Sequence, residues 1–428
     1  MIPCITPLSQ GRWQGAQCRD FERSGGRSGA KSAAGMLLVN SLQMEYNPRM
    51  KIVLATPIYP PEIGGPATYT KELCERLGSS HDITVVAYTH NGVVFPRTKL
   101  FEVEKNAPLP LRLFRFFLAV LRASKDADVI YAQNAVAAGL PSVLAGMIRR
   151  KPVIIKFVGD EAWERATQHR ATEKRLEEFL EHPDGTLRTK LMLLLQGFVL
   201  RRAARVTTPS VYLGEAITRA YHLDPARVVP NYNASEENPH EKPVFPVEKK
   251  AHQIAATARL TAWKGVDGII RALVLVQKKY PDAHLAVAGD GPELGALQEL
   301  ATSLGLQNSV SFLKNISRAE TWQLREESEV YVLNSTYEGL PHTVLTSFAA
   351  RIPIVATDIS GTNEAIQNEV NGLLVPAGDD AALADAIMRY FDDADLRTRM
   401  VAGGTKTLHE KFSWETHVKN LETLLAVR

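Results

Sequence analysis

Lys51-Ile52-Val53-Leu54-Ala55-Thr56 is a short run of mostly apolar residues, and a loop rich in proline and glycine follows it over residues 57–66. An amphipathic pattern with helical spacing then runs over residues 67–77. A short apolar run bounded by turn residues is typical of a buried strand, and a strand followed by a helix is the unit of parallel α/β sheets. The stretch therefore predicts an α/β domain whose first strand begins just after Met50.

The same alternation recurs downstream in two blocks. In the first block, the further expected strands are residues 82–88, 128–131, 152–157 and 205–208, and the further helices are residues 135–148 and one that opens at Ser210. In the second block, the expected strands are residues 253–257, 283–288, 310–313, 330–334 and 353–357, and the helices are residues 266–279, 292–304, 318–326 and 341–350. Two blocks of ordinary domain length predict two α/β domains with a cleft between them. Ligands of such sheets bind beyond the carboxyl ends of the strands.

Two segments lack this alternation. Residues 231–250 are rich in Asn, Glu, Pro and Lys, which is typical of a linker. Residues 1–49 have no steady period before Met36 and no uninterrupted apolar core of the kind found in signal peptides. We interpret them as a disordered leader or an upstream start.

Charge is divided unevenly between the two blocks. Residues 1–235 carry 31 Lys and Arg against 21 Asp and Glu, whereas residues 236–428 carry 19 against 26. A basic first half predicts contact with something anionic. Cys4, Cys18 and Cys74 have no CxxC spacing and cannot build a disulfide framework, and no apolar run reaches the ~18–20 residues of a spanning helix. We therefore expect a cytoplasmic protein.

Two loops that join a strand to a helix carry residue types suited to a phosphate. Gly64 and Gly65 let the backbone approach such a group at a helix N-terminus, although a plain turn explains them equally well. Arg259 and Lys264 also precede a helix, where Arg can fork to two oxygens and Lys acts as a point charge. The alternative is two solvated surface cations, and their position before a helix favours a binding role.

A third loop supplies a carboxylate. Glu338 follows a strand and precedes Pro341, which is placed to start a helix. A carboxylate there suits hydrogen bonds from sugar hydroxyls, and the adjacent helix N-terminus suits a phosphate. Together with Arg259 and Lys264, this loop indicates one pocket for a sugar diphosphate. Gly289-Asp290-Gly291-Pro292, in contrast, is interpreted mainly as a turn that leads into a helix.

In this order the motifs resemble those of the family 4 retaining glycosyltransferases of GT-B architecture, over about residues 50–428. The matching elements are Gly64-Gly65, Thr208-Pro209-Ser210, Val229-Pro230-Asn231, residues 259–265, residues 289–292, Glu338-Gly339-Leu340-Pro341, residues 371–375 and Phe412-Ser413-Trp414. The resemblance implies two Rossmann-like domains facing across a cleft. Its expected parts are an acceptor domain at residues 50–235, a linker at 236–250, a nucleotide-sugar donor domain at 251–408, and a helix at 409–428 that crosses back to the first domain.

The activity that the resemblance implies is retaining transfer of a hexosyl unit from a nucleoside-diphosphate sugar to a glycan or lipid-linked acceptor, in cell-envelope polysaccharide synthesis. The implied catalytic residues are Glu338, Lys264, Arg259 and Asp160. The implied donor-binding residues are Gly64, Gly65, Arg259, Lys264, Glu338, Gly339, Leu340, Pro341, Thr343 and Thr346. The leaving diphosphate would itself help to deprotonate the acceptor, so catalysis would rest on charge stabilisation. Neither a metal, nor another cofactor, nor a nucleic-acid partner is expected.

Two positions depart from the family pattern. The second Glu of the family, eight residues after the first, is Thr346 here, and one hydroxyl cannot accept two hydrogen bonds as a carboxylate does. The family's histidine after the Pro-Val strand is absent from the loop Val158-Gly159-Asp160, where Asp160, Glu161 and Glu164 are the nearest polar substitutes. These departures leave open a non-catalytic GT-B subunit that binds a glycan or a partner, and a different GT-B sugar-nucleotide enzyme.

Residues 111–122 are both cationic and strongly apolar. Such a segment is either an interfacial helix on anionic lipid, at the inner face of a membrane, or a Rossmann helix with its apolar face buried and its arginines outside. The second interpretation is favoured, and the first is kept as the alternative.

Overall fold

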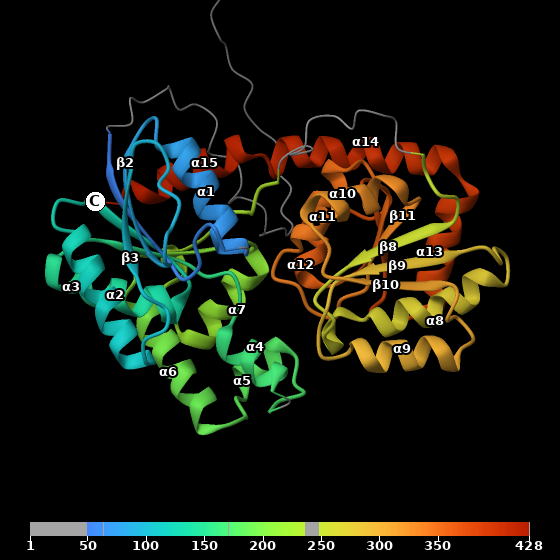
Figure 1. Ribbon diagram of the computed structural model, residues 1–428, viewed down its shortest axis with the longest axis horizontal. Helices are drawn as coiled ribbons and strands as arrows, with labels where there is room; N and C mark the ends of the chain where they lie inside the picture. The colour runs from blue at the N-terminus through green and yellow to red at the C-terminus, as the bar shows by residue number, and fades with distance from the viewer. Residues whose placement is uncertain (1–48, 63, 170, 236–247, 428) are drawn as a thin grey trace, which may run out of the picture. The chain divides into compact units, whose positions relative to one another are not determined.

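The computed structural model describes residues 49–62, 64–169, 171–235 and 248–427, and two parallel sheets organise them (Figure 1). Nearly all of the leader expected at residues 1–49, and most of the linker expected at residues 236–250, lie outside the described residues. The domain boundaries drawn from the sequence therefore stay a prediction.

The first sheet has seven parallel strands in the order β3-β2-β1-β4-β5-β6-β7. Its strands are β1 Lys51–Thr56, β2 Asp82–Tyr88, β3 Thr98–Val103, β4 Val129–Gln133, β5 Val153–Lys156, β6 Arg205–Thr208 and β7 Val228–Pro230. Its helices are α1 Gly65–Leu77, α2 Leu109–Ala123, η1 Ala135–Gly139, α3 Leu140–Arg149, α4 Glu161–Gln168, α5 Leu176–Glu181, α6 Leu187–Arg202, α7 Val211–Tyr221 and η2 Pro225–Arg227.

The second sheet has six parallel strands in the order β10-β9-β8-β11-β12-β13. Its strands are β8 Gln253–Thr257, β9 His284–Ala288, β10 Val310–Lys314, β11 Val330–Leu333, β12 Ile354–Thr357 and β13 Leu373–Val375. Its helices are η3 Ala262–Lys264, α8 Val266–Gln277, α9 Leu294–Ser303, α10 Arg318–Glu327, α11 His342–Ala349, α12 Ser360–Asn363, α13 Asp380–Asp392 and α14 Ala394–Lys411, and the last helix of the chain is α15 Trp414–Leu425. The chain is thus built from two Rossmann-like domains, as expected.

The central strands are buried on both faces. Val53 and Ala55 of β1 belong to one apolar cluster, whereas Ile52 and Leu54 belong to another. Successive side chains of a strand point to opposite faces, so helices must cover both sides of this sheet. This explains why β1 has a continuous apolar sequence instead of an alternating one.

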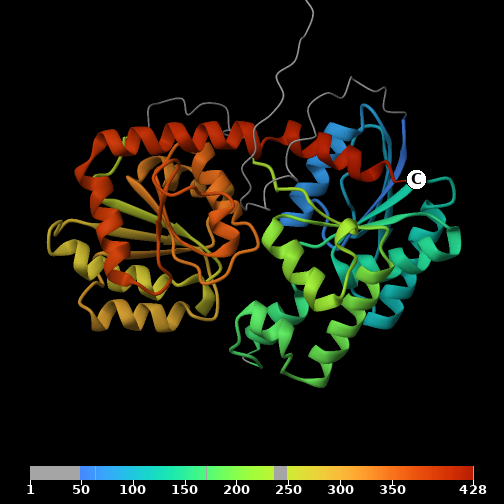
Figure 2. The ribbon, with the colours of Figure 1, turned by 180° about the vertical axis from the view of Figure 1, so that it is seen from behind.

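The last helix returns to the first domain. Leu421 and Leu425 of α15 are buried in the apolar cluster that contains Leu54. The ring of Trp414 stacks on Tyr69 of α1, and the Tyr69 hydroxyl lies 2.8 Å from His417 Nε2. Figure 2 shows α14 and α15, in red, running from the second domain to the first. The predicted crossover is confirmed.

Several local features differ from the expectation. Residues 135–148 form the π-helix η1 followed by α3, and the Asn134 side chain accepts hydrogen bonds from two backbone N–H groups at its start. The edge strand β3 was not predicted, because most of its side chains are not buried and it lacks a continuous apolar run. The helices α4, α5 and α6 were not predicted either. Residues 111–122 do form a helix, α2.

Candidate active site

Two loops of the second domain meet at the carboxyl ends of β8 and β11. Gly265 ends the first loop in the left-handed region, with φ of 61°, and a Cβ atom built on it would lie 2.1 Å from the carbonyl oxygen of Asn334. Glycine is the residue that combines this dihedral angle with so close an approach. The Asn334 amide donates to the Gly265 carbonyl at 2.9 Å, and the Thr336 N–H donates to the Trp263 carbonyl at 2.8 Å. The two loops are thereby held together.

An ion pair joins the side chains of these loops. Lys264 Nζ lies 2.6 Å from Glu338 Oε1, and the Ser335 hydroxyl donates to the same carboxylate oxygen at 2.7 Å. The two charged side chains are 22% and 11% exposed, so both are partly shielded but reachable from solvent. The structure therefore brings together two of the predicted site residues, a cation and an oriented carboxylate.

Arg259, the second predicted cation, faces a neighbouring cavity. This cavity, of about 640 Å³, lies at the carboxyl ends of β8, β9 and β10, and its lining includes Arg259, Lys314 and Gly289-Asp290-Gly291. The Asp290 carboxylate accepts a hydrogen bond from the Gly291 N–H at 2.7 Å, which fits the turn expected there. The position of this cavity is the one at which parallel α/β sheets bind ligands.

Glu338 lines a second cavity, of about 300 Å³, to which both domains contribute. Its second-domain lining includes Tyr337, Glu338 and Gly361, and its first-domain lining consists of Arg175, Glu177 and Tyr212. A Cβ atom on Gly361 would lie 1.9 Å from the Glu338 carbonyl oxygen, so this residue allows the cavity wall to close tightly. Arg259 and Glu338, which were expected in one pocket, thus line two cavities that share no lining residue.

The glycines of the first domain start α1. Helix α1 begins at Gly65 after Gly64, and no side chain caps it. A Cβ atom built on Gly65 would meet no heavy atom within 4 Å. This position therefore leaves open space in front of a helix N-terminus, as a bound anion requires.

The remaining predicted donor residues lie on or just before α11. Gly339 approaches the first domain, because its Cβ position is 3.3 Å from the Val158 carbonyl oxygen, whereas Leu340 is buried in the core. Pro341 and Thr343 flank the first residue of α11. The Thr346 hydroxyl donates back along its own helix, with the His342 and Thr343 carbonyl oxygens at 3.2 and 3.0 Å. The hydroxyl proton of Thr346 is therefore already used within the helix, and only the lone pairs of its oxygen remain to accept a hydrogen bond from a ligand.

Asp160 occupies a buried capping position. Its side chain has no exposed surface, and it accepts hydrogen bonds from the Trp163 N–H at 2.9 Å, Gln196 Nε2 at 3.0 Å and the Tyr221 hydroxyl at 2.5 Å. Burial raises the pKa of Asp160, and these hydrogen bonds oppose the rise. In this conformation Asp160 cannot touch a substrate. The geometry gives it the role of fixing the start of α4, and the side chain would have to leave this position to take the catalytic role expected of it.

Glu164, one turn further along α4, is the carboxylate that faces the cations. Burial raises its pKa to about 7, with the neighbouring acids Glu161 and Asp160 adding to the rise and Lys264 and Arg259 opposing it. Its carboxylate also folds over Gly159, whose Cβ position lies 2.2 Å from Glu164 Oε1. The loop that lacks the family histidine is thus followed by a group that titrates near neutral pH.

Aromatic and polar contacts link the carboxyl edge of the first sheet to that of the second sheet. The ring of Trp163 lies 5.7 Å from Trp263 and 4.6 Å from Tyr337, measured between centroids. The Glu364 carboxylate accepts hydrogen bonds from the Val211 and Tyr212 N–H groups at the start of α7, at 2.9 and 2.7 Å. Sequence reasoning missed Glu364. Ser210 marks the start of α7, but no sequence pattern shows which distant side chain meets that helix.

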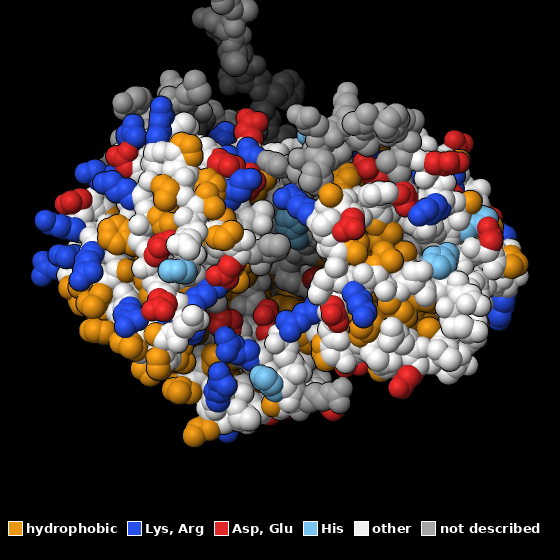
Figure 3. Space-filling model, viewed as in Figure 1, with side chains coloured by type: hydrophobic (Ala, Val, Ile, Leu, Met, Phe, Trp, Pro, Cys, Tyr) orange, Lys and Arg blue, Asp and Glu red, His pale blue; other side chains and the backbone are white. Residues whose placement is uncertain are grey.

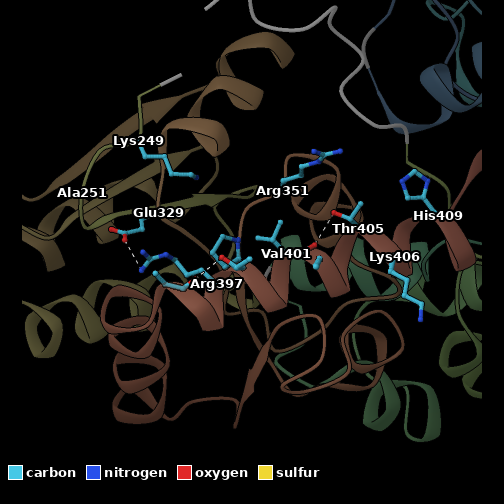
Figure 4. Close-up of a pocket in the computed structure, with 13 residues that line it drawn as sticks. Lys249, Ala251, Glu329, Arg351, Arg397, Val401, Thr405, Lys406 and His409 are labelled. Atoms are coloured by element: carbon cyan, nitrogen blue, oxygen red, sulfur yellow. Dashed lines mark hydrogen bonds and ion pairs between the residues drawn. The ribbon is translucent and has the colours of Figure 1, made fainter. Parts of the chain in front are cut away.

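A larger cavity, of about 1010 Å³, lies at the opposite end of the second sheet (Figure 4). It is lined by α14 and by Lys249, Glu329 and Pro353, which immediately precede strands of the sheet or lie close before them. Arg397, which projects into it, is paired with Glu329 at 3.1 Å. Because sheets of this type bind ligands at the carboxyl ends of the strands, this cavity is not the candidate site.

Within the four described ranges, no cluster of three or more His, Cys, Asp or Glu side chains has a geometry suited to a metal ion. The described helices include none that is long and apolar enough to span a bilayer. The expectation that no metal or other cofactor is needed remains a prediction.

Family comparisons agree with this geometry. Residues 64–234 match the profile of the glycosyl transferase 4-like domain, and residues 237–407 match that of the glycosyl transferases group 1. The chain belongs to the group 1 glycosyltransferases. The two matches correspond to the two sheets, so the GT-B architecture expected from the motifs is confirmed.

Curated relatives of this chain fall into short and long matches. The lipopolysaccharide core biosynthesis glycosyltransferase LpsD of Rhizobium meliloti (strain 1021) is 34% identical over 163 residues, which cover 38% of this chain and 46% of that protein. The chain thus spans about half the length of such relatives. The GDP-mannose-dependent α-(1-6)-phosphatidylinositol monomannoside mannosyltransferase of Mycobacterium tuberculosis (strain CDC 1551 / Oshkosh) is 24% identical, over 88% of this chain and 98% of that one.

Solved structures show the same fold. Alr3699/HepE of Anabaena, in complex with UDP-glucose, superimposes with a TM-score of 0.69 at 20% identity, over 89% of this chain and all of that one.

Proposed function

We propose that the protein transfers a hexosyl unit from a nucleoside-diphosphate sugar to a glycan or lipid-linked acceptor, with retention of anomeric configuration. The observation that carries this proposal is the Lys264–Glu338 pair at the carboxyl ends of β8 and β11, beside a cavity lined by Arg259. Relatives named for lipopolysaccharide core synthesis and for GDP-mannose support it, and so does the similarity to a fold that binds UDP-glucose.

In this proposal each group has a separate task. Lys264 and Arg259 stabilise the charge that develops on the leaving diphosphate, because fixed cations in a shielded site act most strongly where charge appears. Glu338 accepts hydrogen bonds from hydroxyls of the transferred sugar. The C1–oxygen bond to the diphosphate breaks, the acceptor oxygen bonds to C1 on the same face, and its proton passes to the departing phosphate oxygen. No side-chain nucleophile is needed.

The acceptor and its location belong to the same proposal. A basic first domain and relatives that act in lipopolysaccharide or phosphatidylinositol mannoside synthesis suit an acceptor that is anchored in a membrane. We therefore place the reaction at the inner face of a membrane, within cell-envelope polysaccharide synthesis.

The test is a donor panel followed by product analysis. Purified protein is screened for thermal stabilisation by UDP-, GDP- and ADP-sugars, since a ligand that binds only the folded state raises apparent stability. Turnover of the stabilising donor is then measured, and NMR of the product gives the anomeric configuration. Stabilisation without hydrolysis or transfer would favour the alternative of a non-catalytic subunit. The reason to consider this alternative is that Thr346, whose hydroxyl donates to the Thr343 carbonyl oxygen, replaces the second Glu of the family. An inverted product would contradict the retaining mechanism.

A further inference from the structure

Three helices form one outer layer of the first domain. Helix α2 packs on α3, and α3 packs on α6. Their inner sides supply Phe116, Val143 and Val199 to the core. Folding of the sheet requires only these inward residues, so the outward sides are free to serve another purpose.

The outward sides of these helices are unusually apolar. Of the 16 large hydrophobic side chains that are exposed in the described parts of the chain, nine lie on α2, α3 and α6. They are Leu109, Leu111, Phe114, Leu144, Met147, Ile148, Leu187, Leu191 and Leu194. Ile148 is 62% exposed and Leu187 is 84% exposed. Single exposed apolar residues are ordinary, but a gathering of this size marks a surface that contacts something. We call it the α2–α3–α6 face.

Part of the face is a groove between α2 and α3. It encloses about 410 Å³ and is lined only by apolar residues, among them Phe114, Phe117, Leu144, Met147 and Ile148. Figure 3 shows orange side chains gathered over the region where Figure 1 places α2 and α6, with blue side chains of Lys and Arg beside them.

The three helices carry charge of a single sign, and the acid that pairs with Arg115, at 3.5 Å, is Glu104 just after β3. None of the 15, 10 and 16 residues of α2, α3 and α6 is Asp or Glu. The same helices carry Arg112, Arg115, Arg122, Arg149, Arg188, Lys190, Arg201 and Arg202. In contrast, α13 and α14 of the second domain carry both signs of charge. The face therefore combines apolar side chains with cations that have no acidic neighbours on their own helices.

We propose that the α2–α3–α6 face docks on the surface of an anionic phospholipid bilayer. The apolar side chains would enter the region between headgroups and acyl chains, while the arginines bind lipid phosphates. The charge argues against a second copy of this chain as the occupant, because two such faces would bring cations against cations. The inference rests on the proposed function, in that docking would hold the enzyme beside a lipid-linked acceptor.

This docking requires no spanning segment. The exposed large apolar residues of α6 recur at positions 187, 191 and 194, which place them on one side of the helix. A helix of this kind lies parallel to the membrane with one side immersed. Basic residues at the surface of an anionic membrane add about fivefold each to the partition coefficient.

The experiment measures sedimentation of the full chain with vesicles. The probes are vesicles of phosphatidylcholine alone and of phosphatidylcholine mixed with phosphatidylglycerol. We expect binding to the mixed vesicles, reduced about 25-fold by the double substitution Arg115→Gln and Arg122→Gln. The double substitution Met147→Ser and Ile148→Ser should reduce binding by about five- to thirtyfold for each residue.

Matched substitutions on the second domain are the controls. Leu304→Ser removes an exposed apolar residue there, and Lys278→Gln removes an exposed cation. Both should sediment with mixed vesicles as the unchanged chain does. Donor hydrolysis without vesicles should be the same in all variants, and this readout separates failure of docking from failure of the proposed transferase activity.

Two outcomes would overturn the proposal. One is that the unchanged chain fails to bind mixed vesicles, or that the face variants bind as well as the controls. The other is a concentration-dependent dimer that Met147→Ser and Ile148→Ser dissociate, since a second copy would then cover the face.

Discussion

The carboxyl edges of the two sheets use their charged residues in opposite ways. At the first sheet, Asp160 is fully buried with three hydrogen bonds, and Lys156 is buried over the ring of Tyr69, where desolvation lowers the pKa of its ammonium to about 7. At the second sheet, Lys264 and Glu338 contact each other and remain partly exposed. Two sheets of one architecture thus differ, because the charged residues of the first edge are buried in the protein interior while those of the second remain reachable from solvent.

The largest loss of activity is expected from removing the two cations at the carboxyl edge of the second sheet. Lys264→Ala and Arg259→Ala should each lower kcat/KM for the preferred donor by about 10²–10³-fold, because each removes a donor of positive charge to the leaving diphosphate. Lys278→Ala, an exposed lysine just after α8, is the matched control and should leave kcat/KM unchanged. Thermal unfolding should show both site variants folded, and wild-type turnover at limiting donor would refute the diphosphate assignment.

A second prediction concerns the carboxylate of the same edge. Glu338→Gln keeps size but removes charge, so transfer should fall about 10–100-fold, as expected for a lost charged hydrogen bond of about 1.5–3 kcal/mol. Affinity for the bare nucleoside diphosphate, measured by calorimetry, should hardly change because that ligand lacks the sugar. Glu410→Gln on the exposed side of α14 is the control. Equal loss of affinity for donor and diphosphate would indicate a structural role.

A third substitution, Thr346→Glu, adds a negative charge at the carboxyl edge of the second sheet. The hydroxyl of Thr346 is bonded only within α11, so its replacement breaks no contact with another element among those described. A carboxylate there should tighten binding of the preferred nucleotide about tenfold by accepting ribose hydroxyls. Isothermal titration of both proteins measures this. Weaker binding together with a lower Tm would mean that the residues around position 346 accommodate only a neutral side chain and leave the new carboxylate without a partner.

The smallest expected effect lies on the first edge, at Glu164. Its pKa of about 7 in the folded state exceeds the ordinary value of 4.5, so the folded chain retains this proton to higher pH than the unfolded chain does. The free energy of unfolding should therefore fall as pH rises from 4.5 to 7. Glu164→Gln should remove this dependence, and with it an ionisation near neutral pH in the profile of kcat/KM.

Urea unfolding at about pH 5 and about pH 8 provides the measurement for Glu164. The control is Glu178→Gln, an exposed carboxylate on the nearby helix α5. Its pH dependence should match that of the unchanged chain. If Glu164→Gln also matches the unchanged chain, Glu164 ionises as an ordinary surface acid and is not shielded by the second edge.

What the sequence predicted well was carried by local signals. The strand Lys51–Thr56 and the two loops that carry Lys264 and Glu338 follow from apolar runs and from residues placed after them. The capping position of Asp160 did not follow, because its partners Gln196 and Tyr221 lie 36 and 61 residues further along the chain, and no residue near Asp160 specifies these contacts. Position after a strand places a residue at the sheet edge. It does not determine whether the side chain faces a ligand or the core.

The return of α15 affects the order in which the chain can fold during synthesis. The main core cluster of the second domain lies within residues 254–400, so every part of it is synthesised before α15. The first sheet, in contrast, needs Leu421 and Leu425 to cover one of its faces. Until these residues emerge, Leu54 and its neighbours lack part of their packing. The domain that is synthesised first is therefore completed last.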